Sequence, residues 1–340
     1  MKNKRESFVK MKKVMVIIYS LVFTAWNLFS QQSDFPKLIE PYLGQKPPGL
    51  TPELFAPGIV STGLDELNSV FSPDGKEFYF CVRKPGAASI FQMKLENGIW
   101  SKPVLLSFAS RFGDIDVSIS PDGSKLFFSS RRPVSDNADP KSDYDFWMVD
   151  RVGYAWSEPF HLGANINSDR DDFYPMITND GNLYFSSQRE GLGTNNIYCS
   201  KLVNGHYLAA EKLDSSINST YRDFDSYISP DESLLIFASA RPGGFGAEDL
   251  YISFRKADGN WTTAKNMGDK INSQGAEFCP MLSQDGKFLF FTGARRTQAS
   301  FPDKPLSYQE FEIYHNQPQN VFSDIYWVDA KIIDEFKPNK

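Results

Sequence analysis

The chain has 340 residues, of which 15% are aromatic and 21 are proline, and its formal net charge is −6. Many aromatic residues and turn formers, without a long stretch of helical hydrophobic periodicity, indicate an all-β protein rather than a helical one. The acidic balance disfavours nucleic acids and anionic membrane surfaces as partners, because their phosphates would repel the chain.

The first 30 residues are predicted to be a secretory signal peptide. Six lysines and arginines precede an apolar run of sixteen residues, 14–29, and Ser30 offers a small residue for cleavage. The run is shorter than the roughly 20 residues that cross a bilayer, so we expect cleavage rather than a membrane anchor. Cleavage would change the net charge from −6 to −11 and predicts a periplasmic or secreted protein. Residues 31–50, rich in proline and glycine, are expected to be a surface linker.

One turn motif recurs five times and divides the rest of the chain into repeats. Proline presets the first central position, aspartate suits the second and glycine accepts a left-handed backbone, so each copy predicts a hairpin. The aspartates of successive copies lie 48, 58, 51 and 54 residues apart, the spacing of one propeller blade per repeat. The copies are Ser72-Pro73-Asp74-Gly75, Ser120-Pro121-Asp122-Gly123, Thr178-Asn179-Asp180-Gly181, Ser229-Pro230-Asp231-Glu232 and Ser283-Gln284-Asp285-Gly286.

Each repeat is predicted to contain four short strands. The second strand, for example residues 125–128, is almost continuously apolar, as expected for a strand that neighbouring blades cover on both faces. After the third strand, a turn of the Asn-Gly or Asp-Gly type leads to a Trp or Tyr that marks the fourth. The repeats are predicted near residues 64–110, 111–168, 169–219, 220–273 and 274–333.

The fifth repeat lacks a fourth strand of this kind, and the missing piece is predicted near the start of the chain. Residues 54–61 resemble the fourth strand that begins at Trp156, so we expect them to complete the last blade and close the ring. The predicted fold is therefore an all-β propeller of five four-stranded blades in one domain, residues 51–340. Six blades are the alternative, but residues 31–63 contain no further turn of this kind.

The tandem Ser-Pro-Asp-Gly turns, with strands such as Leu-Tyr-Phe-Ser-Ser at 183–187, are similar to the WD40-like repeats called PD40. The resemblance spans roughly residues 64–333 and is strongest over 120–130 and 229–252. Such repeats also form the propeller of the TolB family, and the resemblance implies the same kind of blade. TolB propellers have six blades and a separate N-terminal domain, which this sequence does not predict, so a role in envelope translocation is not implied.

Charged residues gather in two sets of connections that share one face of the predicted ring. Acidic residues precede the first strand of each repeat, and arginines follow the second. Since both recur in every repeat, the simplest interpretation is that they pair around the ring. Two insertions, residues 133–144 and 297–323, break the regularity, and long loops on a rigid scaffold often bind ligands. The candidate binding residues are Arg132, Asp136, Arg189, Arg241, Arg296, Tyr308, Phe311 and Tyr314.

The sequence predicts a non-catalytic, monomeric scaffold that binds an envelope or extracellular protein, or a glycan. The alternative is a glycan-active hydrolase or lyase that uses Asp116, Asp172 or Asp225 in the central channel. The three histidines are scattered and no Gly-x-Ser-x-Gly motif is present, so we expect no metal and no cofactor. The odd number of cysteines, three, predicts buried thiols rather than a disulfide framework.

Overall fold

The computed structural model describes residues 35–338 except 85–86, 110–111, 136–138, 296–303 and 321. The predicted signal peptide and two candidate binding residues, Asp136 and Arg296, lie outside the described residues. The chain divides into two compact units, residues 1–38 and 39–340. Of the first, only residues 35–38 are described, and they contain no helix or strand. All strands of the described chain belong to the second unit.

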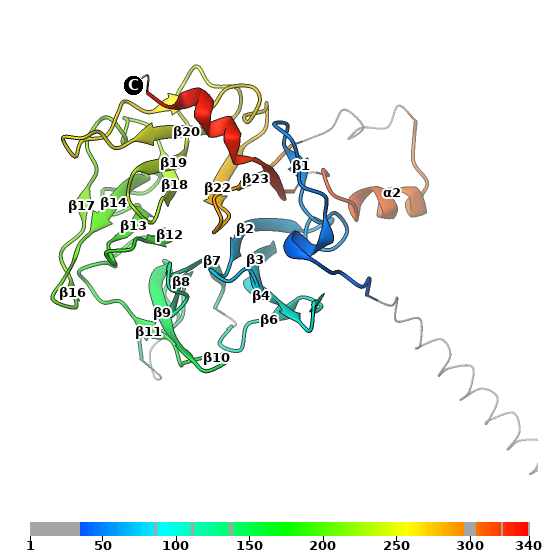
Figure 1. The fold of residues 1–340 in the computed structure, drawn as a ribbon, viewed down its shortest axis with the longest axis horizontal. Coiled ribbons are helices and arrows are strands. Elements are labelled where there is room, and N and C mark those ends of the chain that lie inside the picture. Colours follow the sequence, from blue (N-terminus) through cyan, green and yellow to red (C-terminus); the bar gives the residue numbers. More distant parts are fainter. Residues whose placement is uncertain are drawn as a thin grey trace, which may run out of the picture. The chain divides into compact units, whose positions relative to one another are not determined.

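Five antiparallel sheets, here called blades 1 to 5, form a ring in the described part of the chain (Figure 1). The first strand of each blade lies innermost, and the next two follow outward in sequence order. The fold is thus a five-bladed β-propeller, as predicted, and not a six-bladed one.

The strands of the five blades have the following bounds. Blade 1 contains β2 (Asp65–Phe71), β3 (Glu77–Lys84), β4 (Ala87–Glu96), β5 (Ile99–Trp100) and β6 (Val104–Leu105). Blade 2 contains β7 (Asp114–Ile119), β8 (Lys125–Ser130), β9 (Asp145–Val152), β10 (Ala155–Trp156) and β11 (Phe160–His161). Blade 3 contains β12 (Asp172–Ile177), β13 (Leu183–Ser187), β14 (Asn196–Ser200) and β17 (Glu211–Lys212), with a hairpin of β15 (Leu202–Val203) and β16 (His206–Tyr207). Blade 4 contains β18 (Asp223–Ile228), β19 (Leu234–Ser239), β20 (Asp249–Phe254) and β21 (Lys265–Asn266). Blade 5 contains β22 (Glu277–Leu282), β23 (Phe288–Gly293), β24 (Asp324–Asp329) and β1 (Glu53–Leu54).

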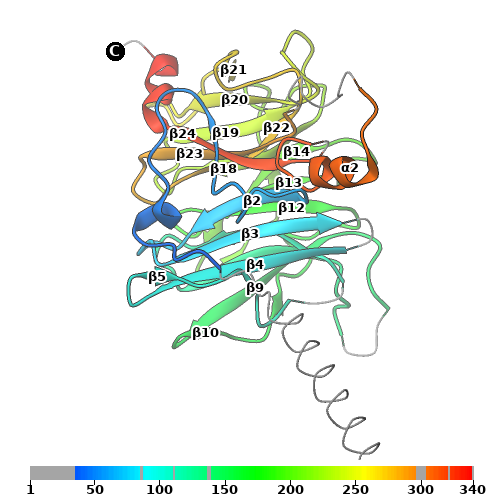
Figure 2. The ribbon, with the colours of Figure 1, turned by 90° about the vertical axis from the view of Figure 1, so that its right-hand side faces the viewer.

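The connections of the ring fall on two faces (Figure 2). In Figure 2 the tight turns between first and second strands lie at the left, on the face here called the lower face, and the connections between second and third strands lie at the right, on the face here called the upper face. α2 (Tyr308–His315), which belongs to the β23–β24 connection, lies on the upper face. The 3-10 helices η1 (Pro41–Gly44) and η3 (Ala330–Phe336) lie on the lower face.

The repeated turn is held by its own side chains. In blade 1 the Ser72 hydroxyl donates to the Asp74 carboxylate at 2.7 Å, and Gly75 has a left-handed φ of 68°. Blade 4 has Glu232 where the other blades have glycine, with a φ of 57°. Its carboxylate accepts a hydrogen bond from the Tyr184 hydroxyl of blade 3 at 2.8 Å. This tie between blades offsets the cost of a non-glycine residue in that conformation.

The fourth strand differs from the prediction, because in blades 1 and 2 it consists of two short pieces. The segments that carry Trp100 and Trp156 pair only with the last residues of the third strand, as β5 and β10. A second piece, β6 or β11, then pairs further back along the same strand. Pro103 and Pro159 stand between the pieces and offer no amide to the ladder, which accounts for the break.

The outermost strand of blade 5 comes from the N-terminal part of the unit. β1 pairs with β24, and the Phe55 amide donates to the Ile325 carbonyl at 2.8 Å. This pairing covers residues 53–55, which is shorter than the predicted 54–61. Ser61 returns to the same strand, where its hydroxyl donates to the Ile325 carbonyl at 3.0 Å. That this segment closes the ring stays a prediction.

Phe55 is fully buried in an aromatic cluster between blades 1 and 5. Its ring centroid lies 5.4 Å from that of Phe78, 5.1 Å from that of Phe290 and 5.2 Å from that of Trp327. Tyr42, from the preceding segment, adds a further ring 5.6 Å from Trp327. Aromatic pairs in such geometry stabilise a fold beyond the area they bury, so this segment is held to both blades.

Candidate functional site

Each blade carries an ion pair, here called the acid–arginine clamp, between the start of its first strand and the end of its second. In blades 2 to 5 the carboxylate of the clamp is fully buried. Four residues of the predicted site belong to these clamps, namely Asp172, Arg132, Arg189 and Arg241. The pairs are Asp65–Arg83 (2.8 Å), Asp114–Arg132 (2.9 Å), Asp172–Arg189 (3.2 Å), Asp223–Arg241 (2.9 Å) and Glu277–Arg295 (3.0 Å).

The arginines of blades 2 to 5 have further partners within the blade. Arg132 also donates to the Phe108 carbonyl at 3.2 Å, and its guanidinium lies over two aromatic rings. Hydrogen bonds to a carbonyl and contacts with two rings recur at Arg189, Arg241 and Arg295. Since these contacts engage each guanidinium on several sides, the clamps of blades 2 to 5 serve the fold.

Blade 1 departs from this arrangement. Its buried acid, Glu66, accepts a hydrogen bond from the Thr62 amide at 3.1 Å, while Arg83 pairs with the neighbouring Asp65. The Arg83 side chain is 51% exposed, and it bonds to no backbone carbonyl of the described residues. The blade that breaks the pattern therefore leaves one arginine accessible on the upper face.

Two residues beyond the buried acid, the first strand of every blade has a β-bulge. The bulged residue has a left-handed φ between 47° and 58° although none is glycine, a conformation that costs free energy. A bulge redirects a side chain, and all five residues are buried on the innermost strands. These channel residues are Asn68, Asp116, Tyr174, Asp225 and Cys279.

The bulges also free backbone amides, which need other acceptors. The Asp225 amide donates to the Ser186 hydroxyl of the preceding blade at 2.7 Å. At the equivalent position blade 4 has Ala238, which offers no hydroxyl. The Cys279 amide of blade 5 bonds instead to the Asp225 carboxylate. The Tyr174 amide of blade 3 likewise donates to the Asp116 carboxylate at 3.2 Å, although blade 2 has Ser129 at the equivalent position. Both channel carboxylates therefore accept a hydrogen bond from a freed amide.

A cavity of about 360 Å³, here called the channel cup, lies at the upper end of the channel. Its lining combines carboxylates, guanidinium groups, amides and three phenylalanines, so it is polar and aromatic at once. A smaller, mainly apolar cavity of about 140 Å³ lies toward the tight turns. The principal residues of the cup are Asp116, Asp225, Cys279, Arg83, Arg222, Glu248, Gln188, Asn195, Phe173, Phe224 and Phe278.

Burial raises the pKa of both channel carboxyls, and the charge of Asp225 raises that of Asp116 further. The pKa of Asp225 rises to about 6, and that of Asp116 rises well above its ordinary value. The Cys279 thiol lies 3.3 Å from an Asp225 oxygen, and burial raises its pKa, so it donates as a neutral thiol. Burial therefore favours the protonated form of both channel carboxyls, most strongly that of Asp116, and two neighbouring carboxyls with unequal pKa values are an arrangement that acid–base chemistry uses.

We expect Asp225 to make the protein less stable as the pH rises from about 4 to about 6. Its folded-state pKa of about 6 exceeds the ordinary 3.8, so the native state holds the extra proton in this window and its advantage is lost above it. The titratable and charged groups that face the Asp225 carboxyl and influence its pKa are Asp116, Cys279, Arg83 and Arg222. Asp225→Asn should therefore gain stability relative to the native chain at pH 7 but not at pH 4, measured by denaturant unfolding.

Other buried carboxyls act in the same direction and serve as an internal check. Burial raises the pKa of Glu66 and of Asp324 to about 7, and it also raises the pKa of Asp116, Asp172 and Glu277. All of them remain in the variant, so a weaker pH dependence should persist. The exposed Asp180→Asn is the matched control. An Asp225→Asn protein with the unaltered pH dependence of the native chain would contradict the assignment.

The predicted aromatic insertion of blade 5 contains a helix. A capping box of Ser307 and Glu310 fixes the start of α2. Tyr308 and Phe311 on this helix are exposed, Tyr314 is partly buried, and none of the three lines the channel cup. The structure therefore does not bring the aromatic candidates together with the channel carboxylates.

Within the described ranges, no three His, Cys, Asp or Glu side chains come together in a way that could hold a metal ion. No helix of the described chain has both the length and the apolar character needed to cross a bilayer. Cys81, Cys199 and Cys279 are free thiols, and the first and third are buried.

Fold and cavity together define a five-bladed β-propeller with a polar cup at its axis. No family model and no curated protein matches the chain. Among solved structures, it is similar to a TolB protein of Agrobacterium tumefaciens, with 19% identity, a TM-score of 0.46, and coverage of 71% of this chain and 73% of that one. TolB of Acinetobacter baumannii has 14% identity and a TM-score of 0.45, and the match covers 78% of this chain and 57% of that one. Hydrazine synthase of Kuenenia stuttgartiensis has 17% identity and a TM-score of 0.39, and the match covers 66% of this chain and 60% of that one. The chain thus spans less than two thirds of the latter two, and the likeness concerns the fold alone.

Proposed function

We propose that this chain is a secreted or periplasmic binding propeller whose channel cup receives the end of a glycan. One observation carries the proposal. Five positions of the same backbone geometry hold four different types of side chain, and two of the five, Asp116 and Asp225, are carboxylates that influence each other in one cavity. Residues that recur in every blade serve the fold, whereas residues that vary at a lined cavity suit a ligand.

The lining of the cup is suited to a sugar. Phe173, Phe224 and Phe278 offer apolar rings to the C–H face of a sugar, while the carboxylates accept hydrogen bonds from its hydroxyls. Gln188 and Asn195 both donate and accept. The volume of about 360 Å³ falls within the range of small-molecule sites.

Titration of the full chain with neutral gluco-, manno- and xylo-oligosaccharides, followed by calorimetry, tests the proposal. We expect one series to bind and Asp225→Asn to weaken that binding at least tenfold, because it removes the ionised acceptor of the cup. Asp180→Asn, an exposed change on the lower face, should leave the affinity unaltered. Failure of every series to bind, or affinity that ignores both Asp225→Asn and Arg222→Gln, would reject the cup as a glycan site.

Hydrolysis or lyase cleavage of the bound glycan is a second candidate, favoured by the unequal pKa values of the two channel carboxyls. Asp116 would act as the acid and Asp225 as the base or nucleophile. Release of reducing ends from the bound oligosaccharide would reveal turnover, and Asp116→Asn or Asp225→Asn should abolish it. Binding without turnover in the native chain leaves the binding function alone.

Export is proposed from the basic and apolar pattern of residues 1–30. In a Gram-negative host, we expect the protein in the periplasmic or culture fraction to begin near residue 31. Mass spectrometry of the intact protein measures this directly. A chain that stays in the cytoplasm with its first 30 residues would contradict export without affecting the cup.

A further inference from the structure

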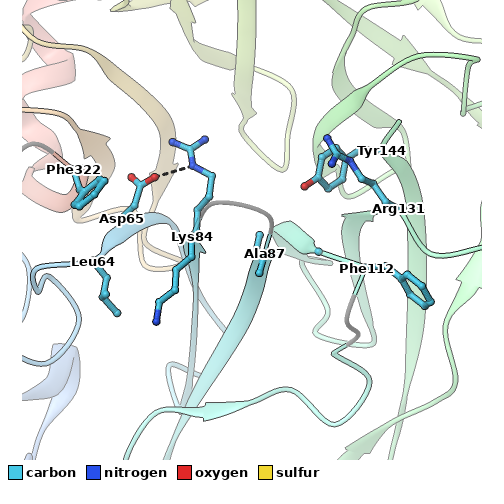
Figure 3. Close-up of a pocket in the computed structure, with 11 residues that line it drawn as sticks. Leu64, Asp65, Lys84, Ala87, Phe112, Arg131, Tyr144 and Phe322 are labelled. Atoms are coloured by element: carbon cyan, nitrogen blue, oxygen red, sulfur yellow. Dashed lines mark hydrogen bonds and ion pairs between the residues drawn. The ribbon is translucent and has the colours of Figure 1, made fainter. Parts of the chain in front are cut away.

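A second cavity, of about 500 Å³, lies on the upper face between blades 1 and 2, and it is here called the side pocket (Figure 3). It shares Arg83 with the channel cup, so the two open on the same face. Three of its lining residues, Ala87, Ala88 and Gly113, have small side chains or none, which leaves room for the cavity. Figure 3 shows Leu64 and Phe322 on one side, Phe112, Arg131 and Tyr144 on the other, and Lys84 and Ala87 between them.

The charges of the side pocket are unbalanced. Arg131 lies over the Tyr144 ring at 4.3 Å, and neither Arg131 nor Lys84 forms an ion pair with any described residue. The carboxylate that lines the pocket, Asp65, is already engaged by Arg83 at 2.8 Å and by the Ser323 amide at 3.2 Å. Two cations without an ion-pair partner among the described residues thus line one cavity of a chain whose net charge is negative.

α2 is anchored next to this pocket. A Cβ atom on Gly63 would lie 2.5 Å from the Asn316 Cα atom, so the end of the helix packs closely against the residue that precedes Leu64. Asn320 secures the contact by donating to the Gly63 carbonyl at 3.1 Å. The helix exposes apolar side chains in turn, with Tyr308 74% and Ile313 69% exposed. Apolar surface without an obvious cover therefore lies beside a cationic cavity.

We propose that the side pocket binds a carboxylate of an acidic polypeptide segment whose apolar residues then lie along α2. A planar guanidinium stacked on an aromatic ring is preorganised for a carboxylate, and tyrosine and arginine are the residues on which protein interfaces most depend. The exposed side chains of Leu64 and Ile313 offer nothing to the hydroxyls of a sugar, which favours a polypeptide over an acidic glycan. Glu310 and Glu312 on α2 repel a second acidic group, so the acidic end must point to the pocket.

Fluorescence anisotropy with the full chain tests this binding. The probes are two fluorescein-labelled peptide pools, one with two adjacent aspartates followed by four random apolar residues, the other with asparagines in place of the aspartates. We expect the acidic pool to bind at least tenfold more tightly, with an affinity that falls as salt is added. Lys84→Gln and Arg131→Gln should each weaken binding at least fivefold, and Ile313→Ser should weaken it without altering the salt dependence.

Lys201→Gln removes an exposed lysine of blade 3, away from the pocket, and is the matched control. Asp225→Asn should leave peptide binding intact, which separates this site from the proposed cup. Lys84 is exposed, so its variant will fold even if Arg131→Gln does not. Equal binding of the two pools, or an affinity for the acidic pool that is the same in the native chain and in Lys84→Gln, would overturn the proposal. Binding of oligogalacturonate in preference to both pools would assign the pocket to an acidic glycan and equally overturn it.

Discussion

Asp223→Ala is expected to lower the free energy of unfolding by about 3–5 kcal/mol, as removal of one partner of a buried ion pair generally does. The Asp223 carboxylate is fully buried and accepts from Arg241 at 2.9 Å, from the Ser239 hydroxyl at 2.6 Å and from the Ser219 amide at 2.6 Å. The Ser219 hydroxyl also donates to this carboxylate, at 2.7 Å. Without Asp223, a guanidinium is left without its charge partner and three further donors lose their acceptor. Equilibrium unfolding in urea measures the loss.

The control for this variant is Asp180→Ala, which removes an exposed carboxylate from a tight turn and should leave stability unchanged. A double variant, Asp223→Ala with Arg241→Met, should lose less than the sum of the single losses, because no unpaired charge remains. If Asp223→Ala were as stable as the control, the clamp would not hold the blade together. Arg241 would then be available to bind a ligand, as its sequence position among the candidate binding residues predicts.

Phe55→Ala should cost about 3–5 kcal/mol of stability, the usual range for a fully buried phenylalanine. Its ring contacts Phe78 of blade 1 and Phe290 and Trp327 of blade 5, so the loss leaves a cavity at the junction of the two blades. If the segment closes the ring, amides of β24 should also exchange hydrogen faster in the variant, while amides of β13 in blade 3, across the ring from this junction, should not. Urea unfolding and hydrogen exchange provide the two measurements.

Phe160→Ala is the matched substitution, since Phe160 is 63% exposed on β11. It should change stability by no more than about 0.5 kcal/mol. A Phe55→Ala protein that unfolds at the same urea concentration as Phe160→Ala would show that the cluster adds little. Uniformly faster exchange in all five blades would argue against a role of this segment specific to the closure.

The blade count could be predicted because turn chemistry is local. Each turn is set by a few residues within one hairpin, such as Ser72, Asp74 and Gly75, so its signal survives in the sequence without knowledge of distant contacts. The clamp partners lie 17 or 18 residues apart at one end of a strand pair, as in Asp114 and Arg132. Their recurrence in every repeat was enough to suggest pairing.

The composition of the cup could be predicted only in part. The sequence analysis names Asp116 and Asp225 as candidates but not Cys279, because a bulge decides that its side chain faces the channel. Arg222 and Glu248 are also missing from the candidates, since they reach the cup from connections that the repeat pattern does not single out. The five bulged positions carry four different residue types, so no single residue type marks them. A usable signal was nevertheless present, since the residue two places after each repeated acid changes from blade to blade. The helix α2 was likewise missed, although its capping box, Ser307 and Glu310, is visible in the sequence.

The five bulges have a consequence for how such a protein can change over time. Each bulge fixes, through backbone geometry, a position from which one side chain faces the channel. The side chains at these positions include a thiol, a phenol and carboxylates. Exchange of one occupant therefore alters the chemistry of the axis while the blades keep their pairing and their clamps. In such a ring the residues that hold the blades together are different from the residues that face the channel. The fold can therefore be kept while the binding specificity changes by one substitution at a time.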